Sequence, residues 1–309
     1  MANSHRPRPP EPAEIRWPTS PVPAATRPLP DPGICRNIPA MAELSRSDGR
    51  QAFGASPHLY DMARPEYPAR VYELLRERCG VGASTRAFEI GPGTGQATRP
   101  LLELGLASLV AIEPDQRLAG FLRNSLGSRA GARLQVRTES FEEAILPAGS
   151  FDLGVAATAY HWLEPGISGR KIFRALAPGG WWAMWWTVFS DPFGRDDFHA
   201  ATQVLFNGLD TPPSFKGDTT LPFGLDVAAR KAELMATGFE TVEQETIRWE
   251  TVLDARQIAA LYGTFSQVAR LGAEEKARFM ERLNEIVDRQ FAGRVERRFV
   301  TPVYLARRP

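Results

Sequence analysis

The stretch from Ala87 to Gln96 carries the residue types and spacing best suited to holding a ligand for chemistry. A short apolar segment that contains Glu89 runs directly into three alternate glycines, Gly91, Gly93 and Gly95. Glycines at every second position let the backbone turn sharply after a strand, and they let a ligand approach main-chain N–H groups without meeting Cβ atoms. The pattern predicts a nucleotide-type binding loop with a carboxylate beside it.

The spacing of the glycines distinguishes this loop from two common nucleotide-binding loops. A phosphate-binding P-loop carries Lys and then Ser or Thr after its last glycine, and here Gln96-Ala97 stands in that place. A dinucleotide fingerprint reads G-x-G-x-x-G, whereas this loop reads G-x-G-x-G, with Gln96 where the third dinucleotide glycine would be. ATP is therefore disfavoured, and an NAD-dependent oxidoreductase takes second place.

A second carboxylate, Glu113, ends the next apolar segment at 109–112. An acid at the tip of the second strand of a βαβ unit, roughly 20 residues past the glycine loop, can accept hydrogen bonds from both hydroxyls of a ribose. At this spacing from the glycine loop, a strand that merely ends in a surface glutamate is the weaker interpretation.

The order Glu89-x-Gly91-x-Gly93-x-Gly95 resembles motif I of the class I S-adenosylmethionine-dependent methyltransferases. The resemblance implies that S-adenosylmethionine is the cofactor and that Glu89 faces its methionine end. Glu113, with Pro114 beside it, would then lie at the ribose, a role that Glu113 would serve equally well for NAD. In this family no pyrophosphate has to be bound.

Two further segments resemble a methyltransferase subgroup related to the type 11 enzymes and to trans-aconitate methyltransferase. The motif Y-x-x-x-R-P-x-Y-P, which starts at Tyr60, precedes the first predicted strand, and the pair His161-Trp162 follows the fourth. The resemblance covers roughly residues 52–188 well and the remainder loosely. It specifies fold and cofactor, and it leaves the methyl acceptor unassigned.

The resemblance also supplies candidates for the rest of the cofactor site. After the third strand a polar residue would meet the adenine amino group and an apolar neighbour would pack on the ring, for which the candidates are Glu139, Ser140 and Phe141. From spacing alone, this segment is equally well a helix N-terminus capped by Thr138 or Ser140. Ala157 and Tyr60 complete the cofactor candidates.

Four residues are candidates for the acceptor pocket: Tyr67, Tyr160, His161 and Trp186. His161 is the candidate general base because imidazole titrates near neutral pH, although a His beside Trp at a strand-to-helix junction more often fixes the loop or shapes the pocket. Tyr60 and Tyr67 would close over the site from a mobile N-terminal lid, with simple packing as the alternative.

Two kinds of chemistry are disfavoured. Enzymes that methylate exocyclic amines of bases carry an Asn/Asp-Pro-Pro-aromatic turn after the fourth strand, and this chain has Ala157-Thr158-Ala159-Tyr160 there. No grouping of His, Asp or Glu has clear metal-ligand spacing, so we expect no metal site.

Apolar periodicity predicts the elements that must position these residues. Strands are expected at 87–90, 109–112, 134–138, 151–156 and 181–188, with helical patterns at 97–104, 116–126 and 166–176 between them. A further helix precedes the first strand. This alternation is typical of a parallel, doubly wound α/β sheet with right-handed crossovers.

The C-terminal part departs from simple alternation. Segments 239–251 and 297–306 alternate like strands, and two amphipathic helices lie between them. We therefore expect a Rossmann-like, seven-stranded sheet of five parallel strands and an antiparallel final pair, with a helical cap at 254–292. The Pro/Gly-rich segment 190–224 is expected to be a substrate-side loop.

Composition narrows the partners and the compartment. A formal net charge of +1 gives no polybasic surface for nucleic acid or an anionic membrane, and two cysteines are too few for a disulfide framework. No window is apolar for long enough to span a membrane, so a cytoplasmic location is expected. Residues 1–40 hold 11 of the 26 prolines and should be disordered, and Met41 is a candidate start for the domain at 41–309.

The sequence as a whole predicts transfer of a methyl group from S-adenosylmethionine to an O, N or C nucleophile of a small molecule by in-line displacement. Holding the nucleophile, methyl and sulfur in line would be the main task of such a protein. An NAD-dependent oxidoreductase and a non-catalytic S-adenosylmethionine-binding module are the alternatives.

Overall fold

The computed structural model describes residues 54, 56–164, 166–192, 194, 196–210, 214 and 221–309. These residues all belong to one compact unit, Ala40–Pro309. The Pro-rich segment 1–40 and the candidate start at Met41 lie outside the described residues, as does most of 211–220. No helix among the described residues is both long and apolar enough to cross a membrane.

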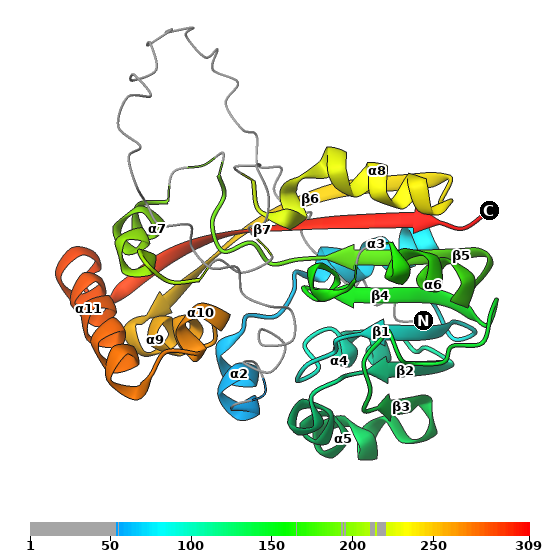
Figure 1. Cartoon of the computed structure of the whole chain (residues 1–309), viewed down its shortest axis with the longest axis horizontal. Helices are drawn as coiled ribbons and strands as arrows, with labels where there is room; N and C mark the ends of the chain where they lie inside the picture. Colours follow the sequence, from blue (N-terminus) through cyan, green and yellow to red (C-terminus); the bar gives the residue numbers. More distant parts are fainter. Residues whose placement is uncertain are drawn as a thin grey trace, which may run out of the picture. The chain divides into compact units, whose positions relative to one another are not determined.

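A seven-stranded sheet with the order β3-β2-β1-β4-β5-β7-β6 forms the centre of this unit (Figure 1). The first five strands pair in parallel: β1 Arg86–Ile90, β2 Ser108–Ile112, β3 Leu134–Arg137, β4 Phe151–Ala157 and β5 Leu176–Trp185. β7 (Arg294–Arg307) runs antiparallel to β5 and to β6 (Thr241–Asp254). The predicted fold class is confirmed.

Helices cover both faces of the sheet. On one face the apolar sides of α3 (Ala69–Cys79), α4 (Thr98–Glu103) and α5 (Gln116–Ala130) share a core with β1, β2 and β4. On the other face α6 (Ile167–Ala175) and α8 (Val227–Thr237) share a core with the opposite sides of the same strands. The short 3₁₀ turns are η1 Gly131–Arg133, η2 Tyr160–Trp162, η3 Gln203–Phe206 and η5 Phe223–Leu225.

The two tryptophans Trp182 and Trp185 show why β5 must be central. Both are fully buried, and because side chains alternate along a strand they enter different cores, Trp182 that of α6 and α8 and Trp185 that of α3. The indole ring of Trp182 has room because residue 154 of β4 is a glycine. An added Cβ at Gly154 would lie 2.4 Å from the Phe88 ring and 2.9 Å from Trp182. Gly154 is thus fixed by packing.

β5 begins earlier than its sequence predicts. We expected the strand to start at Trp181, with Pro178-Gly179-Gly180 closing the preceding helix, but β5 starts at Leu176. Leu176 pairs with Phe151, and the register then shifts so that Leu153 pairs with Trp181. The Pro-Gly-Gly run therefore forms an irregularity within the strand, which is a usual place for glycine in a sheet.

β6 and β7 are 14 residues long and pair along their whole length, while β5 pairs only with the C-terminal part of β7. Their other halves extend past the sheet as a two-stranded ribbon, at the left of Figure 1. Three helices lie between them in sequence: α9 Ala255–Gly263, α10 Ser266–Ala269 and α11 Ala273–Phe291. Segment 190–224, expected as a loop, contains α7 (Asp197–Thr202) and η3, because Asp196 caps α7 and Phe198 is buried.

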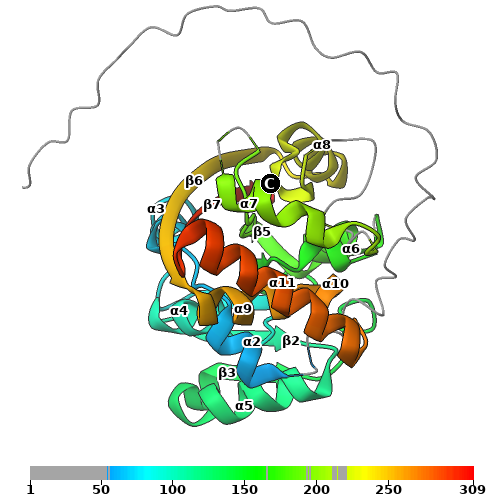
Figure 2. The same ribbon diagram turned by 90° about the vertical axis from the view of Figure 1, so that its left-hand side faces the viewer.

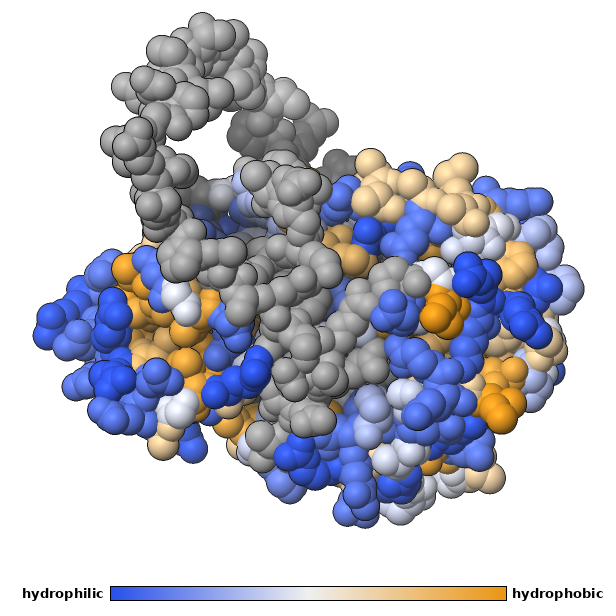
Figure 3. Space-filling model, in the orientation of Figure 1, coloured by the Kyte–Doolittle hydropathy of each residue, from blue (hydrophilic) through white to orange (hydrophobic). Residues whose placement is uncertain are grey.

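These cap helices have a hydrophobic core of their own. Phe198 of α7, Tyr262 of α9 and Leu283 of α11 belong to one buried cluster with Phe299 of the β7 ribbon. Figure 3 shows apolar surface on the cap side of this face, at the left, within a rim of hydrophilic residues.

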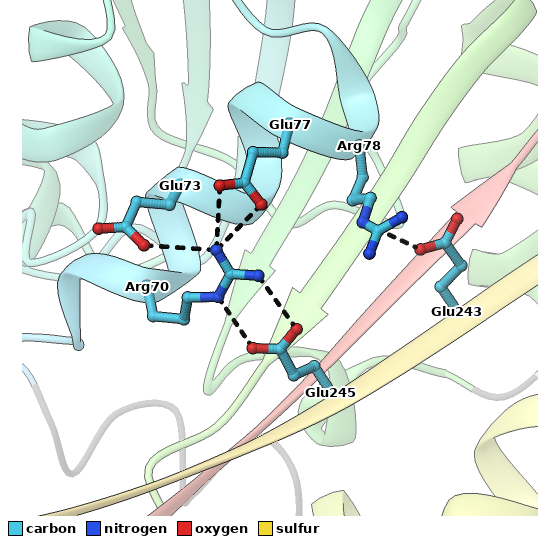
Figure 4. A network of polar contacts seen from close by, with 6 residues as sticks. All are labelled: Arg70, Glu73, Glu77, Arg78, Glu243 and Glu245. Carbon is cyan, nitrogen blue, oxygen red and sulfur yellow. Dashed lines mark hydrogen bonds and ion pairs between the residues drawn. The ribbon is translucent and has the colours of Figure 1, made fainter. Parts of the chain in front are cut away.

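Ion pairs on the outer surface join α3 to the far edge of the sheet (Figure 4). Arg70 donates to Glu77 of its own helix at 2.9 Å and to Glu245 of β6 at 3.0 Å, and Arg78 lies 3.7 Å from Glu243. All of these groups are substantially exposed, so the network fixes the position of α3 more than it stabilises the fold.

Candidate functional site

The predicted site residues follow the carboxyl ends of the parallel strands. β7 runs toward the C-terminus at the right of Figure 1 and is antiparallel to β5, so the carboxyl ends of the parallel strands point left, toward the cap. Figure 2 looks onto this edge and shows α2 (Pro57–Ala63) in front of it, between α9 and α5. Ligands of doubly wound sheets bind at this edge.

All three glycines of the loop after β1 have left-handed backbone conformations, with φ of 63°, 59° and 101° at Gly91, Gly93 and Gly95. An added Cβ would lie 2.8 Å from Ala159 at Gly91 and 2.8 Å from Leu122 at Gly95, so both positions are also closely packed. At Gly93 an added Cβ would meet nothing within 4 Å. The middle glycine thus turns an open main-chain face away from the protein.

Glu113 connects the end of β2 to this loop. Its Oε2 accepts the Gly93 N–H at 3.0 Å and its Oε1 accepts the Asp115 N–H at 3.0 Å, and the residue is 5% exposed. A carboxylate has about four lone-pair positions, so it can accept several donors at once. Pro114 beside it is exposed.

Glu89 is the penultimate residue of strand β1 and is 1% exposed. Burial raises the pKa of its carboxyl to about 8, against the lowering effect of the Thr98 hydroxyl, which donates to Oε2 at 2.7 Å. The charge of Glu113 contributes further to the rise. The Glu89 carboxyl is therefore protonated near neutral pH, unless a cation beside it stabilises the ionised form.

The three candidates after β3 fall in different environments. Phe141 is 2% exposed and its ring is stacked on Phe88 at 6.3 Å, so the structure places it in the core. Ser140 accepts the Glu143 N–H at 3.2 Å and begins a tight turn, but no helix follows, so the alternative of a capped helix N-terminus is not what the structure shows. Glu139 remains partly exposed and accepts a bond from Arg137.

Ala157 ends β4, and Thr158 after it has a strained backbone. Thr158 has φ 53°, unusual for a β-branched residue, and its N–H donates to the Trp185 carbonyl at 2.7 Å. Its hydroxyl lies 2.9 Å from that of Tyr67. Burial raises the pKa of Tyr67, so this phenol stays protonated. Nothing in the sequence marks Thr158, because its conformation depends on contacts from β5 and the N-terminal segment.

Tyr160, His161 and Trp186 come together as an aromatic group at the ends of β4 and β5. The Tyr160 hydroxyl donates to Glu233 of α8 at 2.7 Å, and burial raises its pKa. His161 and Trp186 both pack against Phe223, at ring distances of 6.0 and 5.6 Å. Phe223 was not identified from the sequence, since it lies in a Pro/Gly-rich segment without periodicity.

Trp186 determines how His161 can act. The Trp186 indole N–H donates to His161 Nδ1 at 3.0 Å. An indole nitrogen can only donate, so Nδ1 is the acceptor and the proton of the neutral imidazole lies on Nε2. Nε2 therefore has no lone pair to accept a proton, and Nδ1 can take one only with loss of this bond. This geometry favours the interpretation that His161 shapes the pocket over the interpretation that it is a general base.

The N-terminal helix α2 attaches to the glycine loop through Asp61, which the sequence did not single out. Asp61 Oδ1 accepts from Arg99 at 2.9 Å and from Gln96 at 3.5 Å, and Gln96 in turn accepts from Thr94 within the loop at 2.8 Å. Three residues later, Arg64 donates to the Thr264 carbonyl of the cap at 3.0 Å. α2 therefore lies between the loop and the cap.

Comparison with known proteins agrees with this geometry. Residues 88–184, from β1 to β5, match the family model described as the methyltransferase domain. The chain is 25% identical over 243 residues to an uncharacterised methyltransferase of Mycobacterium tuberculosis, covering 79% of this chain and 88% of that one. A structure of a putative type II methyltransferase from Anaeromyxobacter dehalogenans is 20% identical, with a TM-score of 0.55, covering 79% and 97% of the two chains.

A second solved structure is a phosphoethanolamine N-methyltransferase of Haemonchus contortus in complex with phosphomonomethylethanolamine and S-adenosylhomocysteine. It is 14% identical with a TM-score of 0.52, and the match covers 85% of this chain and only 59% of that longer one. None of the three is described as acting on trans-aconitate, so that subgroup stays a prediction. The sheet topology and the E-x-G-x-G-x-G loop are therefore those of the class I S-adenosylmethionine-dependent methyltransferases, and residues 88–184 match the methyltransferase domain.

Proposed function

We propose that this protein transfers the methyl group of S-adenosylmethionine to an O, N or C nucleophile of a small molecule at the carboxyl edge of the sheet. The observation that carries the proposal is the pairing of Gly93 with Glu113. A left-handed glycine with an open face is held by a buried carboxylate from the neighbouring strand. This arrangement places a carboxylate and an open main-chain face where a ribose would lie, and the loop has no P-loop lysine for a phosphate.

The residues present fit the cofactor in charge as well as in shape. Ionised Glu89 would lie at the methionine end, where the amino group is a cation that compensates its burial. Glu113 and Pro114 would lie at the ribose, and Glu139 and Ser140 at the adenine. Phe141 is too deeply buried to offer its ring face without movement of its neighbours, and we leave it out of the site.

When bound, the cofactor supplies a methyl group already made electrophilic by positive sulfur. What remains for the chain is to orient the acceptor and exclude water. The buried aromatic group of Tyr160, His161 and Trp186 supports this role, since it forms a rigid wall beside the end of β4. The Haemonchus contortus neighbour is described with a small phosphorylated amine, which supports a small-molecule acceptor here as well.

Calorimetry with S-adenosylhomocysteine tests the cofactor site. We expect binding at micromolar concentration by the wild-type protein, no measurable binding by Glu113→Ala, and none by Gly93→Val, whose side chain would fill the open face and strain the turn. The matched control is Gly149→Val: Gly149 has φ 65° and equally open space, but it lies before β4 at the amino edge. This control carries the same backbone strain and should bind normally.

Absence of binding heat with folded wild-type protein would sink the proposal. The NAD-dependent oxidoreductase alternative is tested in the same experiment by NADH, which we expect to give no heat. The non-catalytic alternative requires a turnover measurement. Mass spectrometry of a metabolite extract incubated with S-adenosylmethionine should reveal a methylated product with wild-type protein and none with Glu113→Ala.

A further inference from the structure

Arg64 is a partly buried arginine whose charge is not matched by an acid. In the part of the chain that the structure describes, no carboxylate lies within 4 Å of its guanidinium. One of its N–H groups donates to the Thr264 carbonyl at 3.0 Å, while Nε is buried and has no hydrogen-bond partner. Burial of an unpaired donor on a charged group is costly unless something else bonds to it.

Three aromatic rings hold this guanidinium in place. Its central carbon lies 5.0 Å from the ring centroids of Tyr60 and Phe189 and 5.3 Å from that of Phe265. These rings come from α2, from the segment after β5 and from the cap. Aromatic contacts stabilise the cation without using its donors, so the planar fork is positioned and most of its N–H groups remain available.

The position of Arg64 connects it to the proposed methyl-transfer site. It closes α2 as its C-cap residue, in the same motif as Tyr67. The electrostatic field at the Tyr67 hydroxyl includes contributions from Arg64 and from Glu89, and that hydroxyl lies beside Thr158 at the end of β4. The guanidinium itself lies against Phe189, which follows the carboxyl end of β5, and against Phe265 and Thr264 of the cap.

Two other arginines stacked on phenylalanine have partners that Arg64 lacks. Arg230 lies 3.5 Å from the Phe223 ring and also 3.5 Å from Glu233, so its charge is compensated, although its Nε and Nη1 also make no hydrogen bond among the described residues. Arg308 lies 4.8 Å from Phe173 and donates to the carbonyls of Phe173 and Leu176. Arg64 has neither a compensating acid nor a set of carbonyls.

We propose that Arg64 binds an oxyanion, such as a carboxylate, of a ligand in the methyl-transfer site. A planar guanidinium binds a carboxylate through two parallel N–H···O bonds, and such a pair would satisfy Nε and neutralise the charge. The oxyanion belongs either to the methionine part of the cofactor or to the acceptor. The inference rests on the proposed function, and the experiment separates the two.

The experiment compares wild-type protein with Arg64→Gln, Arg64→Lys and the control Arg308→Gln, which removes an aromatic-stacked arginine at the opposite, amino edge of β5. Calorimetry is performed first with S-adenosylhomocysteine and with 5′-methylthioadenosine, which lacks the amino-acid part. Malonate and inorganic phosphate are then added separately to protein that is saturated with S-adenosylhomocysteine. Thermal melting checks that each variant is folded. Arg64→Lys keeps the charge but not the fork, and it serves as the test if Arg64→Gln does not fold.

If the oxyanion is that of the cofactor, Arg64→Gln weakens S-adenosylhomocysteine binding by about tenfold or more and leaves methylthioadenosine within about twofold. If it is that of the acceptor, nucleoside binding is unchanged, and the wild-type protein and Arg308→Gln bind malonate or phosphate whereas Arg64→Gln does not. The proposal is overturned if folded Arg64→Gln matches wild type with all four probes. Failure of wild-type protein to bind either nucleoside would count against the proposed function instead.

Discussion

Glu89 is the residue in which burial and chemistry oppose each other most directly. Its carboxyl is fully enclosed at the end of β1, and its pKa rises to about 8 from a usual value of 4.5. An unfolded glutamate has no such rise, so between these two pH values the folded chain binds a proton that the unfolded chain does not. Stability therefore falls as pH increases through this window.

We predict that Glu89→Gln, which keeps the shape and the bond from Thr98, removes this dependence. Relative to the variant, the wild-type protein should lose free energy of unfolding, on the order of 4 kcal/mol, between pH 5 and pH 8.5. Urea unfolding of both proteins at the two pH values measures it. If the free energy of unfolding changes equally with pH in both proteins, the Glu89 carboxyl is already ionised in the folded protein and the prediction is wrong.

At the scale of elements, α2 joins two parts of the site that are remote in sequence. Asp61 holds it to the glycine loop through Arg99 and Gln96, and Arg64 holds it to the end of α9. The helix itself contains no buried residue, so its position depends on these side-chain bonds. Such weakly packed elements open most readily.

We predict that Asp61→Asn loosens α2 and weakens S-adenosylhomocysteine binding a few-fold, with little change in melting temperature. The Asp61 and Arg99 side chains are 24% and 27% exposed, and such pairs contribute at most about 1 kcal/mol. Hydrogen exchange of the α2 amides and calorimetry measure the two effects. Asp152→Asn, which breaks a similar exposed pair with Arg86 at the amino edge, is the control and should change neither. Unaltered exchange in α2 would contradict the prediction.

At the scale of the whole unit, the third core, that of the cap, contains a buried ion pair. Arg297 of β7 and Asp196 before α7 are 1% and 6% exposed in their side chains and lie 3.7 Å apart. Arg297 also donates to the Phe189 carbonyl in the segment after β5 and lies against Phe198 and Phe299. The pair therefore ties α7 to the cap ribbon and to the segment that follows β5.

We predict that Asp196→Asn, which can still cap α7, destabilises the protein by about 3 kcal/mol because it leaves a buried arginine uncompensated. The double variant Asp196→Asn/Arg297→Met should recover part of this loss. Chemical unfolding measures both. Glu296→Gln, at an exposed pair with Arg298 on the same strand, is the control. A double variant less stable than the sum of its single changes would exclude the explanation from unpaired charge.

Local patterns were sufficient for most of the fold. Alternating strands and amphipathic helices gave the seven strands, their antiparallel end and the cap helices, because periodicity records which face of an element is buried. α8 and α7 were missed, since neither has a strong pattern within its Pro/Gly-rich surroundings, and the start of β5 was misplaced because Pro178-Gly179-Gly180 forms an irregularity that pairing with β4 stabilises.

The sequence by itself predicted the glycine loop and the acid at the end of β2, because both belong to one βαβ unit, in which glycine spacing and strand length fix their positions. Only the tertiary structure decided which groups surround that loop. In the folded chain Phe141 is buried in the core, and the indole N–H of Trp186 determines which nitrogen of His161 carries the proton. The Thr158 hydroxyl lies beside that of Tyr67, and Arg64 lies among three aromatic rings without an acid. Each of these depends on contacts between segments far apart in the sequence, which no local spacing encodes.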